Sequence, residues 1–157
     1  MELICPIARA LFHPRWCPMR VVLINYEQTL LSAVRGFLET FPNILIVGAF
    51  RDEEEALAKI QSLEPQIALI DLDKKSSTET DFIQKLRSII PELVMIAISI
   101  KDTNQFQEAV IEAGANAFVS KSRVIQDLVS AMQHEISKLS GKDEPDSPVL
   151  NNHSYLV

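Results

Sequence analysis

Cysteine is scarce in this sequence, and its two occurrences suggest no joint role. Cys5 and Cys17 both lie near the N-terminus of a chain of 157 residues. Neither has the CxxC or Cys/His spacing of a zinc site, and together they do not indicate a disulfide framework. These features fit a reducing compartment, and we expect a cytoplasmic protein.

The sequence also lacks a long block of basic residues. Its formal net charge is -6, with 15 Lys and Arg residues against 21 Asp and Glu residues. Proteins that bind a nucleic-acid duplex usually concentrate Lys and Arg on one face or along one helix. We therefore expect no direct contact with nucleic acid.

Long apolar runs are absent as well. No run approaches the ~20 residues that cross a bilayer as a helix. The first 18 residues carry Glu2 and three prolines, at positions 6, 14 and 18, which fits neither the charge pattern nor the apolar core of a signal peptide. We expect no membrane span and no export signal.

The composition of the chain is that of one globular domain. Hydrophobic residues make up 47% and charged residues 23% of the sequence, which is close to the average for folded domains. We expect an N-terminal extension over 1–18, a domain over 19–140 and a disordered tail over 141–157, where the sequence is polar and contains prolines.

Short apolar segments alternate with longer helical patterns from Met19 onward. Apolar residues at successive positions are typical of strands that are covered on both faces. The expected strands are Val21–Ile24, Ile44–Phe50, Ile67–Leu72, Val94–Ser99 and Ala117–Ser120. The alternation predicts a doubly wound α/β fold, with a parallel sheet and helices on both faces.

Each expected strand is followed by apolar residues at steps of three and four, which predicts five amphipathic helices. Asp52, with Glu55 three residues later, is expected to cap the second helix, and Ser122 the fifth. The fifth helix is expected to end by Leu139. The stop signals of the first four helices are Pro42, Pro65, Pro91 and Gly114.

Polar residues follow several of the expected strands. Because ligands of open parallel sheets gather at the carboxyl ends of the strands, these positions are the candidates for chemistry. They are Asn25, Tyr26, Asp71, Ser99 and Lys121. A carboxylate nucleophile, a cation and a hydroxyl donor are the groups that formation of an acyl phosphate requires.

The chain from Arg20 to about Leu139 resembles the receiver domain of bacterial two-component response regulators, especially those that usually carry a helix-turn-helix output. The resemblance rests on the joint order and spacing of ALIDLD with Asp71, AISI with Ser99, and AGANAFVSK with Lys121. It implies a flavodoxin-like five-stranded sheet in the order 2-1-3-4-5. The chain offers no room for a helix-turn-helix unit, so we expect a stand-alone receiver.

The resemblance also implies roles for these residues. Asp71 is the phosphoacceptor, Ser99 and Lys121 assist it, and Ser99 and Phe118 form the switch pair. The phosphoryl group comes from a histidine kinase or a phosphotransfer protein. The signal leaves through the last two helices and last strand, to a downstream protein partner or to a second copy in a homodimer. We thus expect a signalling protein and not an enzyme.

Two stretches depart from the family pattern. Asn25 and Tyr26 stand where the family has an acidic pair that holds Mg²⁺, so we expect a metal site that is weak or absent. Its ligands would be Asp71, the main-chain carbonyl of Asp73 and Asn25. The side chain of Asp73 is a partial replacement for the missing acids. The loop over 72–78 also lacks the family's Met-Pro-x-x-x-Gly-like turn.

Simpler interpretations exist for each of these residues. Asp71 can begin a turn, Ser99 can cap a helix, Lys121 can be a solvated surface lysine and Phe118 can be core. At the level of function, the alternative is a pseudo-receiver that binds partners without phosphotransfer. A flavin-binding electron carrier is disfavoured, because no glycine-rich phosphate loop follows the first strand and the chain has four glycines.

Overall fold

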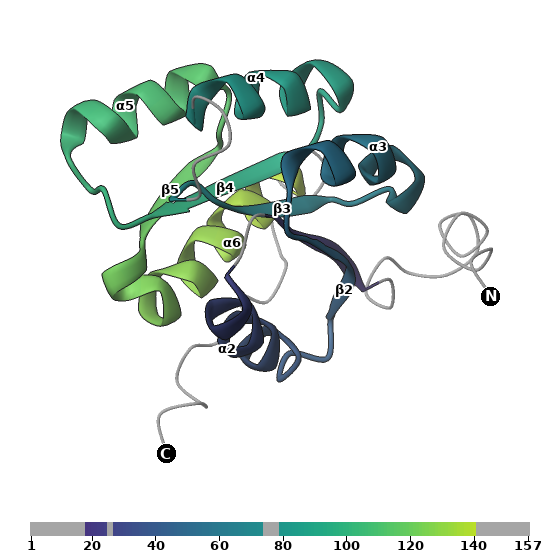
Figure 1. The fold of residues 1–157 in the computed structure, drawn as a ribbon. Coiled ribbons are helices and arrows are strands. Elements are labelled where there is room, and N and C mark those ends of the chain that lie inside the picture. Colours follow the sequence, from purple (N-terminus) through teal and green to yellow (C-terminus); the bar gives the residue numbers. More distant parts are fainter. Residues whose placement is uncertain (1–17, 25–26, 74–78, 141–157) are drawn as a thin grey trace.

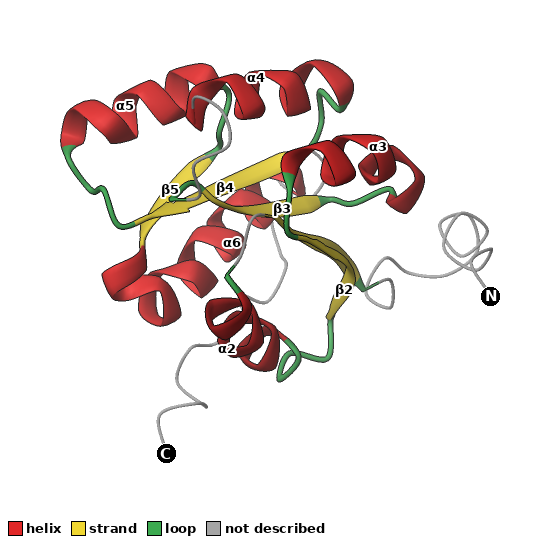
Figure 2. Cartoon of the chain, viewed as in Figure 1, coloured by secondary structure: helices red, strands yellow, loops and turns green. Residues whose placement is uncertain are grey.

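The computed structural model describes residues 18–24, 27–73 and 79–140 as a parallel sheet with helices on both faces (Figures 1 and 2). The sheet has five strands in the order β2-β1-β3-β4-β5, and every neighbouring pair is parallel. The predicted fold class and strand order are therefore confirmed. The expected extension, apart from Pro18, and the expected tail lie outside the described residues, so the predicted domain limits stay predictions.

The strands lie within two residues of their predicted bounds. They are β1 Met19–Ile24, β2 Ile44–Phe50, β3 Ile67–Asp71, β4 Val94–Ser99 and β5 Ala117–Ser120. All residues of β3 and β4 are buried, as expected for strands between two layers of helices.

The helices end at the predicted stop signals or a few residues before them. They are α2 Gln28–Leu38, α3 Glu53–Leu63, α4 Glu79–Ile89, α5 Asn104–Ala113 and α6 Val124–Ser140. A 3-10 turn, η2 Lys121–Arg123, connects β5 to α6. Helix α6 runs one residue past its predicted end.

Both ends of α3 are capped by specific contacts. The Asp52 side chain accepts a hydrogen bond from the Glu55 amide at 2.8 Å, which confirms the predicted cap. At the other end Glu64 adopts φ 47 before Pro65. Arg20 of β1 donates to the free carbonyl of Leu63 at 2.6 and 3.0 Å, which ties this helix end to the sheet.

The predicted cap of the last helix was wrong. Ser122 lies inside η2, and its hydroxyl is 2.9 Å from the hydroxyl of Ser120. The 3-10 turn occupies the three residues after β5, so α6 begins at Val124. Ser122 is therefore not the residue directly before the helix, as an N-cap would be.

Two apolar layers hold the helices to the sheet. Helices α3, α4 and α5 cover one face and α2 and α6 the other (Figure 1). Phe82, Ile83 and Leu86 of α4 fill the first layer, while Leu128 and Met132 of α6 belong to the second. Alternate residues of each strand point into one apolar layer or the other. Both faces of the sheet are therefore covered, and polar groups gather at the ends of the strands.

One arginine joins α4 to the start of β5. The Arg87 guanidinium donates to the carbonyls of Gly114, Pro91 and Leu93 and to the side-chain oxygen of Asn116, at 2.6 to 3.2 Å. Gly114 ends α5 with φ 125, a conformation that glycine adopts without steric cost. This contact lies at the edge of the sheet where β4 and β5 begin.

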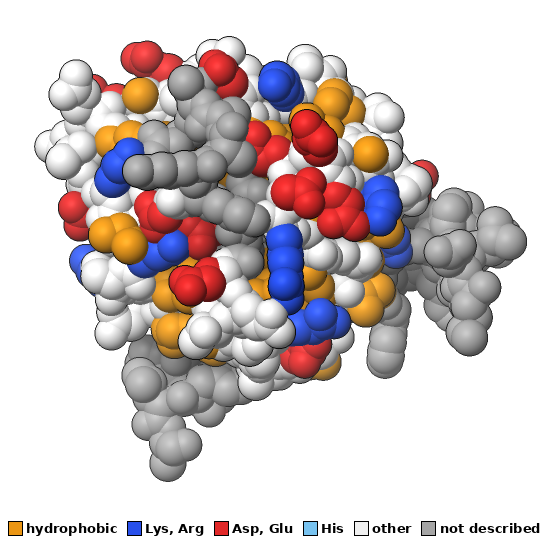
Figure 3. Space-filling view, viewed as in Figure 1, with side chains coloured by type: hydrophobic (Ala, Val, Ile, Leu, Met, Phe, Trp, Pro, Cys, Tyr) orange, Lys and Arg blue, Asp and Glu red, His pale blue; other side chains and the backbone are white. Residues whose placement is uncertain are grey.

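On the face seen in Figure 3, Lys and Arg side chains are spread among Asp and Glu side chains and gather in no single patch. No helix among the described ranges has both the length and the apolar character needed to span a bilayer. The expected cytoplasmic location stays a prediction.

Candidate functional site

The carboxyl ends of three neighbouring strands bring Asp71, Ser99 and Lys121 to one edge of the sheet. Asp71 is the last residue of β3, Ser99 the last of β4, and Lys121 follows β5 directly. The parallel register sets Asp71 beside Ile98 and Ser99 beside Ser120. The sheet order therefore places together three residues that lie far apart in the sequence. Their chemical roles stay predictions.

The carboxylate of Asp71 is bound on both of its oxygens. Lys121 Nζ lies 2.7 Å from Oδ2, and the amide of Asp73 donates to Oδ1 at 3.0 Å. The side chain of Asp71 is 4% exposed. The ion pair and the hydrogen bond compensate for the burial of a charge at the end of an apolar strand.

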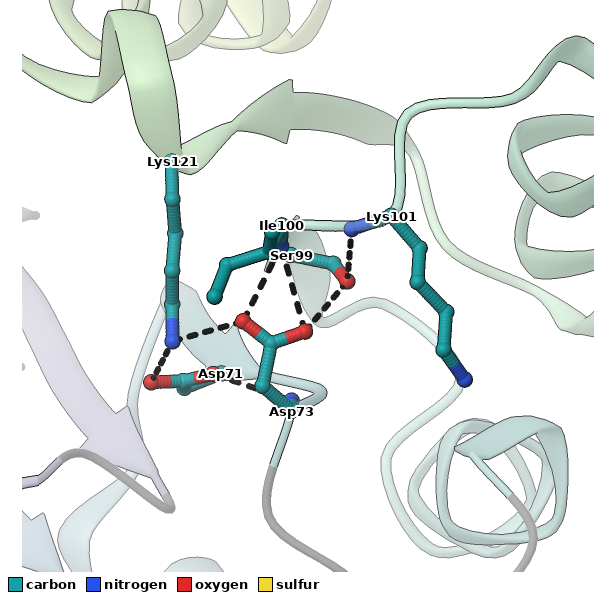
Figure 4. A network of polar contacts seen from close by, with 6 residues as sticks. All are labelled: Asp71, Asp73, Ser99, Ile100, Lys101 and Lys121. Carbon is teal, nitrogen blue, oxygen red and sulfur yellow. Dashed lines mark hydrogen bonds and ion pairs between the residues drawn. The ribbon is translucent and has the colours of Figure 1, made fainter.

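A second carboxylate, that of Asp73, lies at the centre of the site (Figure 4). Ser99 donates its hydroxyl to Asp73 Oδ1 at 2.6 Å, and the Ile100 amide donates to both oxygens at 3.1 and 2.9 Å. Lys121 Nζ lies 2.7 Å from Oδ2. Three donors, from the end of β4, the residue after it and η2, thus converge on one side chain.

Ser99 is fully buried, and both functions of its hydroxyl are used. The hydroxyl donates to Asp73 and accepts a hydrogen bond from the Lys101 amide at 3.0 Å. These two bonds orient the hydroxyl toward the carboxylate of Asp73.

Charges at this edge shift the pKa values of two groups. Burial alone would raise the pKa of the Asp73 carboxyl, but hydrogen bonds from Lys121, Ser99 and Ile100 and the charge of Lys121 bring it below its ordinary value of 3.8. Burial would likewise lower the pKa of the Lys121 ammonium, but hydrogen bonds and charges from Asp71 and Asp73 raise it above 10.5. Both groups are therefore charged at neutral pH.

Phe118, the predicted switch residue, lies on β5 and is half-buried. Its ring packs edge-on against Phe106 of α5 at a centroid distance of 6.0 Å. The ammonium of Lys101 lies 5.3 Å from the centroid of Phe106. The aromatic pair thus connects β5 to α5 near the loop that follows Ser99, and its role as a switch stays a prediction.

The described residues fit a magnesium ion poorly. Within the described ranges, no three His, Cys, Asp or Glu side chains gather as a metal-ion site. The two carboxylates at this edge already share the ammonium of Lys121, at 2.7 Å each. Asn25 and Tyr26, which enter the predicted weak site, lie outside the described residues.

Sequence reasoning missed what the Asp73 side chain binds. We expected its main-chain carbonyl, with its side chain as a partial replacement for metal-binding acids. The structure instead directs the side chain to Ser99, Ile100 and Lys121. The spacing of Asp71 and Asp73 was an available signal, since residues two apart in an extended segment point to the same side.

The model of the response regulator receiver domain family matches residues 21–133. Among curated proteins, the transcriptional regulatory protein MctR of Rhizobium johnstonii is 24% identical over 115 residues, which cover 73% of this chain and 54% of the relative. The nitrate/nitrite response regulator protein NarL of Escherichia coli is 23% identical over 133 residues, which cover 85% and 62%. The chain thus spans about half to three fifths of the length of these relatives.

Solved structures share the fold. The isolated receiver domain of RcsB from Salmonella enterica serovar Typhimurium, with a phosphomimetic beryllium fluoride, has a TM-score of 0.68 and 21% identity, covering 84% of this chain and 96% of its own. A CheY-like receiver protein from Methanospirillum hungatei has a TM-score of 0.70 and 18% identity, covering 80% and 99%.

The expectation that nucleic acid is not a direct ligand is not supported by these comparisons. One curated relative, EvgA of Escherichia coli, is described as a DNA-binding transcriptional activator, at 24% identity over 73% of this chain and 56% of its own. A structure of RcsB is described as a complex with DNA, with a TM-score of 0.71 and 19% identity over 77% of this chain and 64% of its own.

Proposed function

Because the chain belongs to the response regulator receiver domain family, we propose that Asp71 accepts a phosphoryl group from a histidine kinase or a phosphotransfer protein. Receiver domains are signalling modules that work with such donors. The observation that carries the proposal is the position of Lys121, whose ammonium lies 2.7 Å from an oxygen of a buried aspartate at the end of the central strand.

The proposed step is a displacement at phosphorus. An oxygen of Asp71 forms a bond to phosphorus while the bond from phosphorus to the imidazole nitrogen of the donor histidine breaks. The electron pair of that bond stays on the nitrogen, which takes up a proton. The ammonium of Lys121, the hydroxyl of Ser99 and the amide of Ile100 are the groups at this edge that stabilise negative charge on the transferred oxygens.

The output side of the proposal uses Ser99 and Phe118. A phosphoryl group on Asp71 would change the partner of the Ser99 hydroxyl. The loop after Ser99 carries Lys101, which contacts Phe106 of the pair with Phe118. We propose that this chain of contacts alters the surface made by residues 103–139, which binds a downstream protein or a second copy.

Relatives that are longer than this chain extend the proposal. Their names include a DNA-binding transcriptional activator and a transcriptional regulatory protein. We therefore propose that the downstream partner is a DNA-binding output unit. The predicted stand-alone arrangement stays a prediction.

A second candidate function is that of a pseudo-receiver, a module that binds partners without phosphotransfer. The environment of Asp71 favours the pseudo-receiver, because the side chain is 4% exposed and both of its oxygens are bound within the protein. The two contacts draw electron density from the carboxylate, and its burial restricts the approach of a phosphoryl donor, so both features lower the reactivity of this nucleophile.

The test is labelling with acetyl phosphate or phosphoramidate, with and without Mg²⁺, followed by intact mass and peptide mapping. We expect one added phosphoryl group on Asp71 in the wild type and none in Asp71→Asn. Labelling elsewhere, or equal labelling of both proteins, contradicts the assignment of Asp71. No labelling under any condition favours the pseudo-receiver.

A further inference from the structure

The donors that would stabilise a phosphoryl group on Asp71 are already bound to another anion. Lys121, Ser99 and the Ile100 amide all contact the carboxylate of Asp73, at 2.6 to 3.1 Å (Figure 4). They reach it from η2, from the end of β4 and from the residue after β4. Their common target is therefore set by the sheet and not by one local turn.

The backbone holds this carboxylate in place. The Leu72 amide donates to the carbonyl of Ile98 at 2.9 Å, and the Asp73 amide donates to Asp71 Oδ1 at 3.0 Å. The backbone amides of Leu72 and Asp73 are therefore both held by residues at the ends of β3 and β4. The Asp73 carboxylate is therefore an anion held in a fixed position near the Asp71 carboxylate.

A carboxylate and a phosphoryl group compete for such donors because both are anionic acceptors that take charge-assisted hydrogen bonds. A phosphoryl group carries about -1.5 to -2 charges at neutral pH and three acceptor oxygens. Placed on Asp71, it would face the Asp73 carboxylate with charge of the same sign. The single hydroxyl proton of Ser99 cannot be donated to both anions, and the Lys121 ammonium already divides its donors between the Asp71 and Asp73 carboxylates.

We propose that Asp73 is a built-in competitor for the phosphoryl group, whose carboxylate occupies the phosphoryl-binding donors of this site until it is displaced. This inference rests on the proposed function where it concerns phosphorylation of Asp71. It adds a means of regulation, since any partner contact that draws Asp73 away frees the three donors. It also means that Ser99 is turned toward an anion before any phosphoryl group arrives.

The first arm of the test measures the rate of Asp71 labelling by acetyl phosphate at a fixed Mg²⁺ concentration. The proteins are the wild type, Asp73→Asn, Asp73→Ala and the control Asp102→Asn, which makes the same change at an exposed residue of the neighbouring loop. We expect Asp73→Ala to react about tenfold faster than the wild type or more, because one competing set of charge-assisted bonds is gone. Asp102→Asn is expected to match the wild type.

The second arm does not depend on phosphorylation. Inorganic phosphate is titrated into Asp71→Asn and into Asp71→Asn with Asp73→Ala, in metal-free buffer at constant ionic strength, and the amide resonance of Ile100 is followed. We expect a saturable shift in the double variant and none in Asp71→Asn alone. Asp73→Asn, which keeps the size of the side chain, and the dispersion of the amide spectra check that the variants fold.

The outcomes separate this inference from the proposed function. If no protein is labelled but the double variant alone binds phosphate, the phosphoacceptor proposal fails and the competitor stands. Equal labelling rates for the wild type and both Asp73 variants would overturn the competitor and leave the phosphoacceptor in place. Equal phosphate binding by Asp71→Asn and the double variant would also overturn the competitor.

Discussion

The ammonium of Lys121, which follows β5, lies 2.7 Å from the carboxylate of Asp71 at the end of β3. Strand β4 lies between these two strands in the sheet. The Lys121 side chain is 18% exposed and Asp71 4%, so water screens this pair much less than a surface pair. Asp73 takes the same ammonium at 2.7 Å. One ammonium therefore forms ion pairs with two neighbouring carboxylates.

We predict that Lys121→Met destabilises the protein, because it leaves two carboxylates side by side without their cation. The expected loss in the free energy of unfolding is about 2 kcal/mol, less than for a fully buried pair. Urea denaturation at neutral pH measures it. Lys59→Met is the matched control, since Lys59 pairs with Glu55 at the same 2.7 Å but is 60% exposed, and should cost under about 0.5 kcal/mol. Equal losses in both variants would contradict the prediction.

Arg87→Met is expected to cost about 3 kcal/mol of unfolding free energy, because it leaves the partly buried carbonyl oxygens of Gly114 and Leu93 without the guanidinium donor. The exposed bonds to Pro91 and to the side chain of Asn116 are lost as well. Urea denaturation again gives the value. Arg35→Met removes an exposed pair with Glu39 and should stay within about 0.5 kcal/mol of the wild type. A loss at Arg87 no larger than at Arg35 would show that these contacts contribute little.

The stabilisation from Asp73 is expected to depend on pH in one direction. Its pKa in the folded protein lies below the ordinary value of 3.8, so folding favours the charged form. That stabilisation is fully present above pH 3.8 and is lost as the pH falls through the folded pKa. The difference in unfolding free energy between the wild type and Asp73→Asn should therefore shrink in acid. Urea denaturation in the presence of a chelator, from neutral pH to about pH 3, measures it, and a difference that grows in acid would refute the sign.

Mg²⁺ is predicted to bind the wild type weakly, because Asn25 and Tyr26 replace two carboxylates. Restoring them, in the double change Asn25→Asp with Tyr26→Asp, should tighten Mg²⁺ binding by about tenfold or more, since the hard cation prefers carboxylate oxygen. Calorimetric titration with Mg²⁺ alone compares the two proteins. Tight binding by the wild type that the double change leaves unaltered would mean that the site draws on other ligands.

Phosphorylation is predicted to change partner binding through Phe118. If the switch proposal holds, the wild type loaded with acetyl phosphate and the unloaded Asp71→Asn variant differ in affinity for the downstream partner, and Phe118→Ala removes that difference. Phe37→Ala is a control of the same chemistry, since Phe37 packs edge-on against Phe41 on the other face of the sheet. Identical binding by all of these proteins would support the pseudo-receiver.

The sheet was predictable from the sequence because its central strands are buried on both faces. Ile67 to Ile70 and Val94 to Ile98 are apolar at successive positions, and few other environments require that pattern. Strand β1 begins two residues before its predicted start. The prediction missed these two residues because they are only half-buried and do not belong to the continuous buried run. Arg20, the second of them, contacts α3 and the segment after it, which is a tertiary reason that periodicity does not show.

The arrangement of the site was only partly predictable. The edge that gathers Asp71, Ser99 and Lys121 follows from strand order, which the family resemblance supplied. The direction of the Asp73 carboxylate depends on three donors that come together only in the folded chain. The cap assigned to Ser122 was wrong because a 3-10 turn precedes α6, and such turns are frequent at the ends of α-helices.

Arg87 fixes the end of α4 and the Gly114 turn to the edge of the sheet where β4 and β5 begin. The opposite end of the strands, their carboxyl end, carries Asp71, Ser99 and Lys121. A displacement of α4 and α5 relative to the sheet is therefore expected to pivot about the arginine and to grow toward the aspartates. We therefore expect α4 and α5 to move least near Arg87 and most at the N-terminus of α5, close to Ser99.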